Sequence, residues 1–234
     1  MRTSNGFLIA VEGIDGSGKS SLVSNLAITL EQKEYQVLKT KEPGGTTLGL
    51  QLRNILNKER NPDAPTIVCP KAEFLLFAAD RAQHFTTLVI PALNKNYIVI
   101  SDRTGDSSLA YQGYGRGLDR AMIQSINMWA TENRKADLVI YIRIDAQTAY
   151  QRVITRNKNL TSFEAESLEF WKKVGAGFDE MYTGRNDVLI LDGTKTQEEL
   201  CELALQEVLK RLLINNKQND SLRHPRLDRG SRQP

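Results

Sequence analysis

The sequence has few of the residues that mark secreted, metal-stabilised or membrane proteins. Its 234 residues include two cysteines and two histidines, and Cys69, Cys201, His84 and His224 lie far apart. This set cannot supply a disulfide framework or the close spacing of a zinc site. The longest apolar run near the start, residues 7–11, is too short for a membrane span or the hydrophobic region of a signal peptide. We therefore expect a cytoplasmic protein with no membrane partner.

The chain also lacks a strong excess of one charge. Its net charge is +3, and residues 215–234 account for all of it, with five basic and two acidic side chains. A nucleic-acid-binding domain is expected to carry its positive charge on a folded face, so this distribution argues against a nucleic-acid partner. The segment 215–234 is polar and shows no apolar period, which predicts a disordered basic tail.

No internal repeat and no linker rich in proline, glycine and serine divides residues 1–214. Short runs that are apolar throughout alternate with amphipathic stretches, a pattern typical of a parallel sheet covered by helices on both faces. We therefore predict a single α/β domain. Strands are expected at 7–11, 37–40, 97–101, 138–142 and 188–191, and helices at 19–31, 71–90, 119–133, 146–156, 163–181 and 196–213.

A glycine-rich segment follows the first predicted strand and opens the first predicted helix. Residues 13–20 match the pattern G-x-x-x-x-G-K-[ST], in which backbone N–H groups and the positive end of the helix hold phosphates. In this pattern Lys19 reaches the β- and γ-phosphate oxygens and the Ser20 hydroxyl ligates Mg²⁺. The sequence thus predicts a site for a nucleoside triphosphate. Its predicted contacts are Gly13, Ile14, Asp15, Gly16, Ser17, Gly18, Lys19, Ser20 and Ser21.

Other classes of phosphate-loop protein find little support. A GTPase needs an N-K-x-D motif to read its base, and the nearest segment, residues 94–97, has no aspartate. A larger motor ATPase normally carries an acidic pair at a strand end, whereas the strand at 97–101 leads into Asp102 and Arg103. An acid beside an arginine suits a magnesium ligand next to an anion clamp. That pairing is expected where one phosphate is handed to another.

Five segments occur in the order found in a known family. They are Glu12–Asp15, Lys41–Thr46, the helix around 74–81, Asp102 with Arg103, and residues 106–113. Together they closely resemble the bacterial kind of thymidylate kinase, over about residues 6–213. The resemblance implies a P-loop NTPase fold with about five parallel strands, ATP and dTMP as substrates, and Mg²⁺ as cofactor. The implied reaction converts Mg·ATP and dTMP to ADP and dTDP.

The residues are chemically consistent with this reaction. The acceptor is a phosphate monoester whose second pKa is about 6, so it is mostly ionised near pH 7 and needs no general base. Catalysis then depends on positioning two anions and cancelling the charge between them. Arginine and lysine side chains at loops are suited to that work.

The resemblance also implies roles for residues that hold the nucleoside part of dTMP. Asp15 would bind the 3′-hydroxyl of the sugar, and Tyr111 would press on the ribose and leave no room for a 2′-hydroxyl. Phe77 would stack on thymine, and Arg81, one helical turn further on, would donate to O4 of the base. Ser107 and Gln112 belong to the same lining.

The acceptor phosphate has a predicted site of its own. Arg103 would grip the phosphate because it follows the strand end that faces the phosphate loop. Lys41 stands where the family usually has arginine and would make a weaker phosphate contact, since lysine lacks the two-pronged guanidinium. Pro43 would shape the wall of the site. Ser20 and Asp102 are the predicted metal ligands.

The predicted lid, residues 152–164, matches the family least well. Gly16 replaces the phosphate-loop arginine of one class of thymidylate kinases, so a lid arginine is expected to supply that charge. We predict Arg156 for this role, with Arg152 and Lys158 in support. The predicted catalytic residues are thus Lys19, Asp15, Arg103 and Arg156. The apolar helix 71–90 implies a homodimer by the same resemblance.

Two alternatives remain open from the sequence. In the first, the chain is another nucleoside or nucleoside monophosphate kinase. In the second, it is a P-loop protein that binds ATP without catalysis. Preference among acceptors separates the first alternative, and ATP binding without phosphoryl transfer would favour the second.

Overall fold

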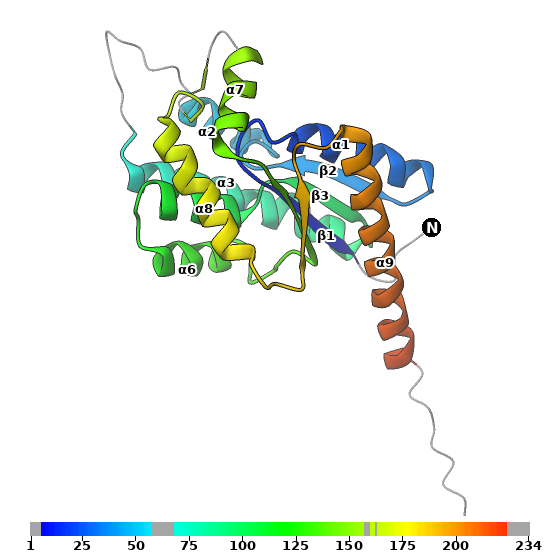
Figure 1. Ribbon diagram of the computed structural model, residues 1–234. Helices are drawn as coiled ribbons and strands as arrows, with labels where there is room; N and C mark the ends of the chain where they lie inside the picture. Colours follow the sequence, from blue (N-terminus) through cyan, green and yellow to red (C-terminus); the bar gives the residue numbers. More distant parts are fainter. Residues whose placement is uncertain (1–5, 58–67, 157–159, 162, 224–234) are drawn as a thin grey trace, which may run out of the picture.

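The computed structural model describes residues 6–57, 68–156, 160–161 and 163–223. Within these residues, five strands form one sheet in the order β2-β3-β1-β4-β5, and every neighbouring pair is parallel (Figure 1). Each strand boundary lies within one residue of its predicted position. The strands are β1 (Phe7–Glu12), β2 (Val37–Lys41), β3 (Ile98–Asp102), β4 (Leu138–Arg143) and β5 (Val188–Asp192). The predicted α/β fold with a five-stranded parallel sheet is confirmed.

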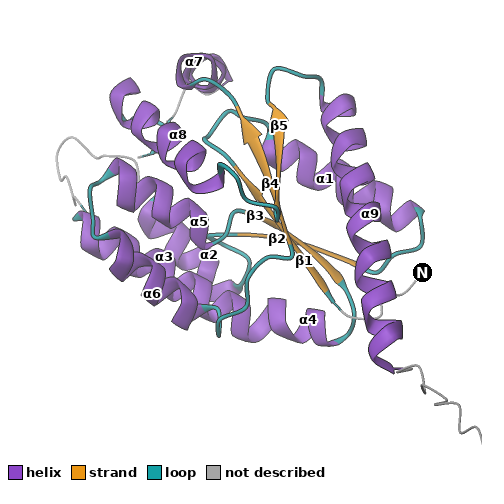
Figure 2. Cartoon of the chain, turned by 60° about the horizontal axis from the view of Figure 1, so that its bottom comes forward, coloured by secondary structure: helices purple, strands orange, loops and turns teal. Residues whose placement is uncertain are grey.

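Helices cover the sheet on both faces, as Figure 2 shows. One face packs against α1 (Lys19–Gln32) and α9 (Gln197–Arg223), whose apolar side chains join those of the strands in one core cluster. The other face packs against a second core cluster that includes α7 (Ala146–Arg156) and α8 (Leu168–Tyr182). The helices α3 (Pro70–His84) and α6 (Arg120–Ala130) complete that side.

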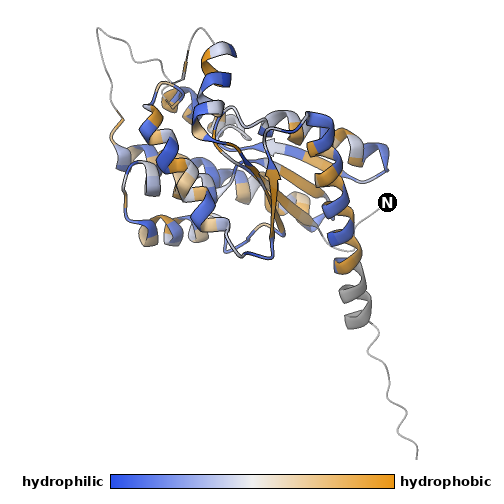
Figure 3. Ribbon diagram, viewed as in Figure 1, coloured by the Kyte–Doolittle hydropathy of each residue, from blue (hydrophilic) through white to orange (hydrophobic). Residues whose placement is uncertain are grey.

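The central position of β1 explains the unbroken apolar run of its residues 7–11. All six of its residues are buried, because β3 and β4 flank it and helices cover both its faces. In Figure 3 the strands are mostly hydrophobic, whereas the helices alternate hydrophobic and hydrophilic residues. Burial of continuous runs on both faces is what a parallel sheet requires.

Shorter elements connect these helices and strands. They are α2 (Thr47–Leu56), η1 (Phe85–Val89), α4 (Ile90–Asn94), α5 (Gly105–Ser108) and η2 (Leu109–Gly115). The π-helical turns η1 and η2 extend α3 and α5. Within the described residues, no helix has the length and apolar character needed to cross a bilayer.

The helix predictions need five corrections. Neither α2 nor the helical segment formed by α5 and η2 was predicted. The predicted helix 71–90 is divided into α3, η1 and α4, because Pro91 lacks the N–H that would continue the regular hydrogen-bond pattern. The predicted helix 163–181 begins only at Leu168, where Ser167 caps it. Finally, α9 continues to Arg223, so the predicted start of a disordered tail at residue 215 falls inside a helix.

Candidate active site

The carboxyl ends of β1, β2 and β3 meet at one edge of the sheet. Their parallel register places Val11 beside Asp102, and Asp102 beside Lys41. The loops that leave these three strands therefore start next to one another. In an open parallel sheet this edge is where ligands bind.

The phosphate loop adopts the curled backbone that its sequence predicts. Gly13, Gly16 and Gly18 have φ values of 144°, 80° and 99°, a region that L side chains rarely adopt. The loop ends where α1 begins, at Lys19. The Lys19 ammonium donates to the Ile14 carbonyl at 2.7 Å, and burial together with nearby Arg103 lowers its pKa to about 8. Backbone N–H groups and a buried cation are thus gathered at a helix N-terminus, where anions bind.

Packing explains why Gly16 carries no side chain. A Cβ atom at this position would lie 2.5 Å from the Ala149 carbonyl oxygen and 3.1 Å from Val153, both on α7. The helix α7 therefore occupies the space that a phosphate-loop arginine would need.

The two predicted metal ligands are in direct contact. The Ser20 hydroxyl donates to Oδ2 of Asp102 at 2.6 Å. A hydroxyl and a carboxylate at the mouth of a phosphate loop fit Mg²⁺, which takes one or two protein oxygens and completes its shell with phosphates and water. The described residues contain no group of three or more His, Cys, Asp or Glu side chains arranged to hold a metal alone.

The guanidinium of Arg103 is held by groups on the phosphate loop, α5 and η2. Its Nη1 donates to the Gly13 carbonyl at 3.0 Å and to the Ser107 hydroxyl at 2.9 Å. Its Nη2 donates to the Asp15 carboxylate and to the Tyr111 hydroxyl. Burial alone would raise the pKa of Asp15, but Arg103 and Lys19 lower it to about 2. Asp15 is therefore ionised at neutral pH.

A buried carboxylate lies directly beneath this arginine. Glu12 accepts hydrogen bonds from the Thr104 N–H at 2.7 Å, from the Thr104 hydroxyl at 2.9 Å and from the Ser107 hydroxyl at 2.6 Å. The backbone of Arg103 has a φ of 76°, which is uncommon for a residue with a side chain. Glu12 thus anchors Thr104, the residue that follows the strained backbone of Arg103. Burial and nearby Asp106 raise its pKa to about 7.

A cavity beside Arg103 brings most of the predicted acceptor residues together. Phe77 lies on one side, with its ring centroid 5.7 Å from that of Phe163, and Tyr111 lies 6.1 Å from the same ring. Lys41 is not in this lining. The predicted residues that line the cavity are Asp15, Pro43, Phe77, Arg81, Arg103, Ser107, Tyr111 and Gln112.

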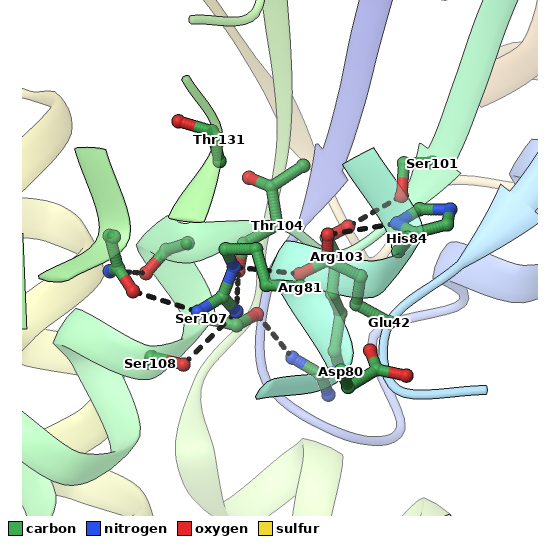
Figure 4. A network of polar contacts seen from close by, with 12 residues as sticks. Glu42, Asp80, Arg81, His84, Ser101, Arg103, Thr104, Ser107, Ser108 and Thr131 are labelled. Carbon is green, nitrogen blue, oxygen red and sulfur yellow. Dashed lines mark hydrogen bonds and ion pairs between the residues drawn. The ribbon is translucent and has the colours of Figure 1, made fainter. Parts of the chain in front are cut away.

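Most of the hydrogen bonds of Arg81 are made to the protein itself, whereas the sequence predicts a side chain directed at the base. Arg81 is 1% exposed, and its guanidinium donates to Glu42 at 2.9 Å, Asn127 at 2.7 Å, the Thr104 carbonyl at 3.2 Å and Ser108 at 3.1 Å (Figure 4). A guanidinium has five N–H groups, so four bonds leave one N–H on Nη1 without a partner among the described residues.

Sequence reasoning missed the polar cluster behind Arg81. The two ring nitrogens of His84 form hydrogen bonds with the Thr40 hydroxyl at 2.7 Å and with the Glu42 carboxylate at 3.0 Å. Asp80 accepts from the Gly44 N–H at 3.0 Å. Asp80 and His84 are both fully buried. Because Glu42 is 42 residues from His84, no local spacing marks the pair. Two signals were available in the sequence. Glu42 directly follows a strand, and Asp80 and Arg81 are an acid–arginine pair on a helix.

The lid arginines lie outside this cavity. Arg156 ends α7, is 61% exposed and pairs with Glu164 at 3.1 Å. Arg152 donates to the Gly193 carbonyl at 2.9 Å, so it joins α7 to the loop after β5. The predicted supporting residue Lys158 lies outside the described residues. Thr161, Phe163 and Glu164 reach the cavity from the lid.

Two anion-binding arrangements therefore face each other at one sheet edge, one on the phosphate loop and one around Arg103. Such a pair suits transfer of a phosphoryl group between two bound anions, with little covalent chemistry left to the protein. By its fold and its site, the chain is a P-loop phosphotransferase.

Comparison with known proteins defines the family. The thymidylate kinase family model matches residues 11–203. Thymidylate kinases of Bacillus cereus (strain Q1) and Bacillus anthracis (strain CDC 684 / NRRL 3495) are each 36% identical over 210 residues, which is 89% of this chain and 99% of theirs. The crystal structure of thymidylate kinase from Ehrlichia chaffeensis is similar with a TM-score of 0.69 and 29% identity, covering 87% of this chain and 99% of that one.

The chain belongs to the thymidylate kinase family. The family predicted from the sequence is confirmed, and with it the class of nucleoside monophosphate kinases.

Proposed function

We propose that this protein transfers the γ-phosphoryl group of Mg·ATP to dTMP, which gives ADP and dTDP, and that it does so in the cytoplasm. The observation that carries the proposal is the position of Arg103, whose guanidinium contacts the Gly13 carbonyl of the phosphate loop at 3.0 Å. A phosphate held by Arg103 lies next to one held by the loop. Proximity of this kind replaces a bimolecular encounter and supplies much of the rate.

On the donor side, residues 13–21 hold the phosphates of ATP. Lys19 is buried with its ammonium turned back onto the loop, within 4.0 Å of Asp15, and it neutralises the β- and γ-phosphates. Ser20 and Asp102 would hold Mg²⁺, which would supply positive charge to offset the negative charge of the phosphates.

On the acceptor side, each predicted residue has a role consistent with its place in the cavity. Arg103 holds the phosphate of dTMP, and Asp15, which is ionised, accepts from the 3′-hydroxyl. Tyr111, whose hydroxyl donates to Asp15 at 3.1 Å, packs against the sugar. Phe77 stacks on the base, while the remaining N–H of Arg81 donates to O4. Pro43 and Ser107 close the wall, and Lys41 adds charge from outside it.

The lid contributes the last cation. Arg156 is at the end of α7, the helix that packs against Gly16 of the phosphate loop. We assign Arg156 the task of stabilising the negative charge that develops on the transferred phosphoryl group. This task needs a guanidinium close to both nucleotides. Its ion pair with Glu164 must then be exchanged for a contact with substrate.

The test is ADP production from Mg·ATP with dTMP, dUMP, thymidine, CMP and AMP as acceptors. We expect strong turnover with dTMP and at most weaker turnover with dUMP. A preference for another acceptor would instead favour a different nucleotide kinase. Tight ATP binding without turnover on any of the five would favour the non-catalytic alternative.

We also propose a homodimer. Large apolar side chains are exposed on α3 and α6, which pack side by side (Figure 2): Leu75 is 55% exposed, Met122 58% and Trp129 79%. A second copy that covers them would remove this surface from water. Light scattering should give twice the chain mass for the wild type and the chain mass for Trp129→Glu. Leu203→Glu on α9, on the opposite side of the sheet, should leave the dimer intact.

A further inference from the structure

Gln112 has an amide orientation that its partner imposes. The residue lies in η2, is 1% exposed and lines the acceptor cavity. Its Nε2 donates to Oε1 of Glu73 at 2.9 Å. A carboxylate only accepts, so the NH₂ group of the amide must face Glu73 and the carbonyl oxygen is the atom left for a group in the cavity.

Glu73 is in turn held by Arg116. Arg116 donates from Nε to Oε1 at 3.2 Å and from Nη2 to Oε2 at 3.1 Å, a two-pronged contact that fixes the plane of the carboxylate. The same guanidinium lies 2.8 Å from Glu166 and 4.6 Å from the centre of the Phe170 ring. Glu73 itself is 6% exposed and lies in the first turn of α3.

We propose that Glu73 is a positioning residue that keeps the carbonyl oxygen of Gln112 directed at the base edge, and so selects a base with an N–H at position 3. This inference rests on the proposed function, and specifically on Gln112 as part of the base site. Thymine and uracil carry that N–H. Cytosine carries a lone pair there, which would face the carbonyl oxygen and leave both acceptors unsatisfied.

The experiment measures binding by calorimetry with two probes, dTMP and N3-methyl-dTMP, which has a methyl group in place of the hydrogen on N3. The wild type should bind dTMP about tenfold more tightly, the value of one hydrogen bond of ordinary strength. In Glu73→Ala the amide of Gln112 is released and can turn, so the preference should shrink to about threefold or less. A structural role alone would weaken both probes equally and leave their ratio unchanged.

The matched control is Glu166→Gln, which removes the other carboxylate partner of Arg116 and leaves the bond between Glu73 and Gln112. It should keep the wild-type ratio. If Glu73→Ala does not fold, Glu73→Leu gives the same readout, because it fills more of the space and also removes the acceptor of the Gln112 amide. An unchanged ratio in the Glu73 variants, or an equal loss in the control, would overturn the inference.

The proposed function fails separately. Wild-type protein that binds dTMP but shows no preference over N3-methyl-dTMP contradicts only the role of Glu73 and Gln112. Wild-type protein that neither binds dTMP nor forms ADP with it contradicts the proposed function, and this inference with it.

Discussion

Two arginines with related proposed tasks are held in opposite ways. Arg103, directly after β3, is 15% exposed and donates to four groups on the phosphate loop, α5 and η2. Arg156, at the end of α7, is 61% exposed and pairs with Glu164, eight residues further on. A side chain fixed by its surroundings loses little conformational freedom when a substrate binds, whereas an exposed one must be ordered at that moment. Arg103 is thus already positioned to hold the acceptor phosphate, whereas Arg156 must be ordered when the substrates bind.

The sheet explains the difference. Arg103 follows the strand next to β1, so the phosphate loop, η2 and buried Glu12 surround it. Arg156 extends from a helix that touches the loop at Gly16 and leads into residues 157–159, outside the described part of the chain. The register of the parallel strands sets the position of Arg103, whereas only the end of α7 sets the position of Arg156.

Replacing Arg103 should have the largest effect. Arg103→Ala removes the phosphate clamp and leaves Asp15 with one cation fewer, so kcat/KM for dTMP should fall on the order of 10³-fold. KM for ATP should stay within about threefold. Steady-state kinetics with each substrate varied in turn makes the measurement. Arg120→Ala, which breaks an exposed pair with Glu180, is the control, and comparable losses in both variants would contradict the built-in clamp.

Replacing Arg156 should have a smaller and different effect. Arg156→Ala should lower kcat about 100-fold, as loss of one charge-stabilising donor does, while KM for dTMP changes little. Arg152→Ala on the same helix removes a bond to a backbone carbonyl and should cost far less. If Arg156→Ala raises KM for dTMP as much as Arg103→Ala does, the proposed division of labour between lid and strand end is wrong.

The smallest effect concerns stability through Glu12. Its pKa rises from 4.5 to about 7 on folding, so between these values the folded state binds the extra proton. This stabilising contribution is present below about pH 4.5 and is lost as pH rises through 7. From pH 5 to 8 the wild type should therefore lose stability relative to Glu12→Gln, by on the order of 2–3 kcal/mol.

Denaturant melts at both pH values measure this difference. Glu180→Gln is the control, because hydrogen bonds from Tyr114 and Arg120 lower the pKa of the exposed Glu180 carboxyl, so it stays ionised across the range. Parallel pH profiles for the wild type and Glu12→Gln would show that Glu12 does not titrate with folding.

The parts of the site that sequence could predict are those set by local pattern or strand order. The phosphate loop is continuous in sequence, and Arg103 follows a strand whose place next to β1 brings it to the loop. Contacts that depend on tertiary packing could not be predicted. The pairing of His84 with Glu42, the four partners of Arg81 and the two-pronged grip of Arg116 on Glu73 all join residues more than twenty positions apart.

The central claim is that the acceptor phosphate is held by the strand-end network without help from the lid. Calorimetric titration of dTMP into the wild type, Arg103→Ala and Arg156→Ala, in the absence of ATP, tests it most directly. The account predicts affinity at least about 100-fold weaker for Arg103→Ala and within about threefold of the wild type for Arg156→Ala. Equal losses in the two variants would contradict it.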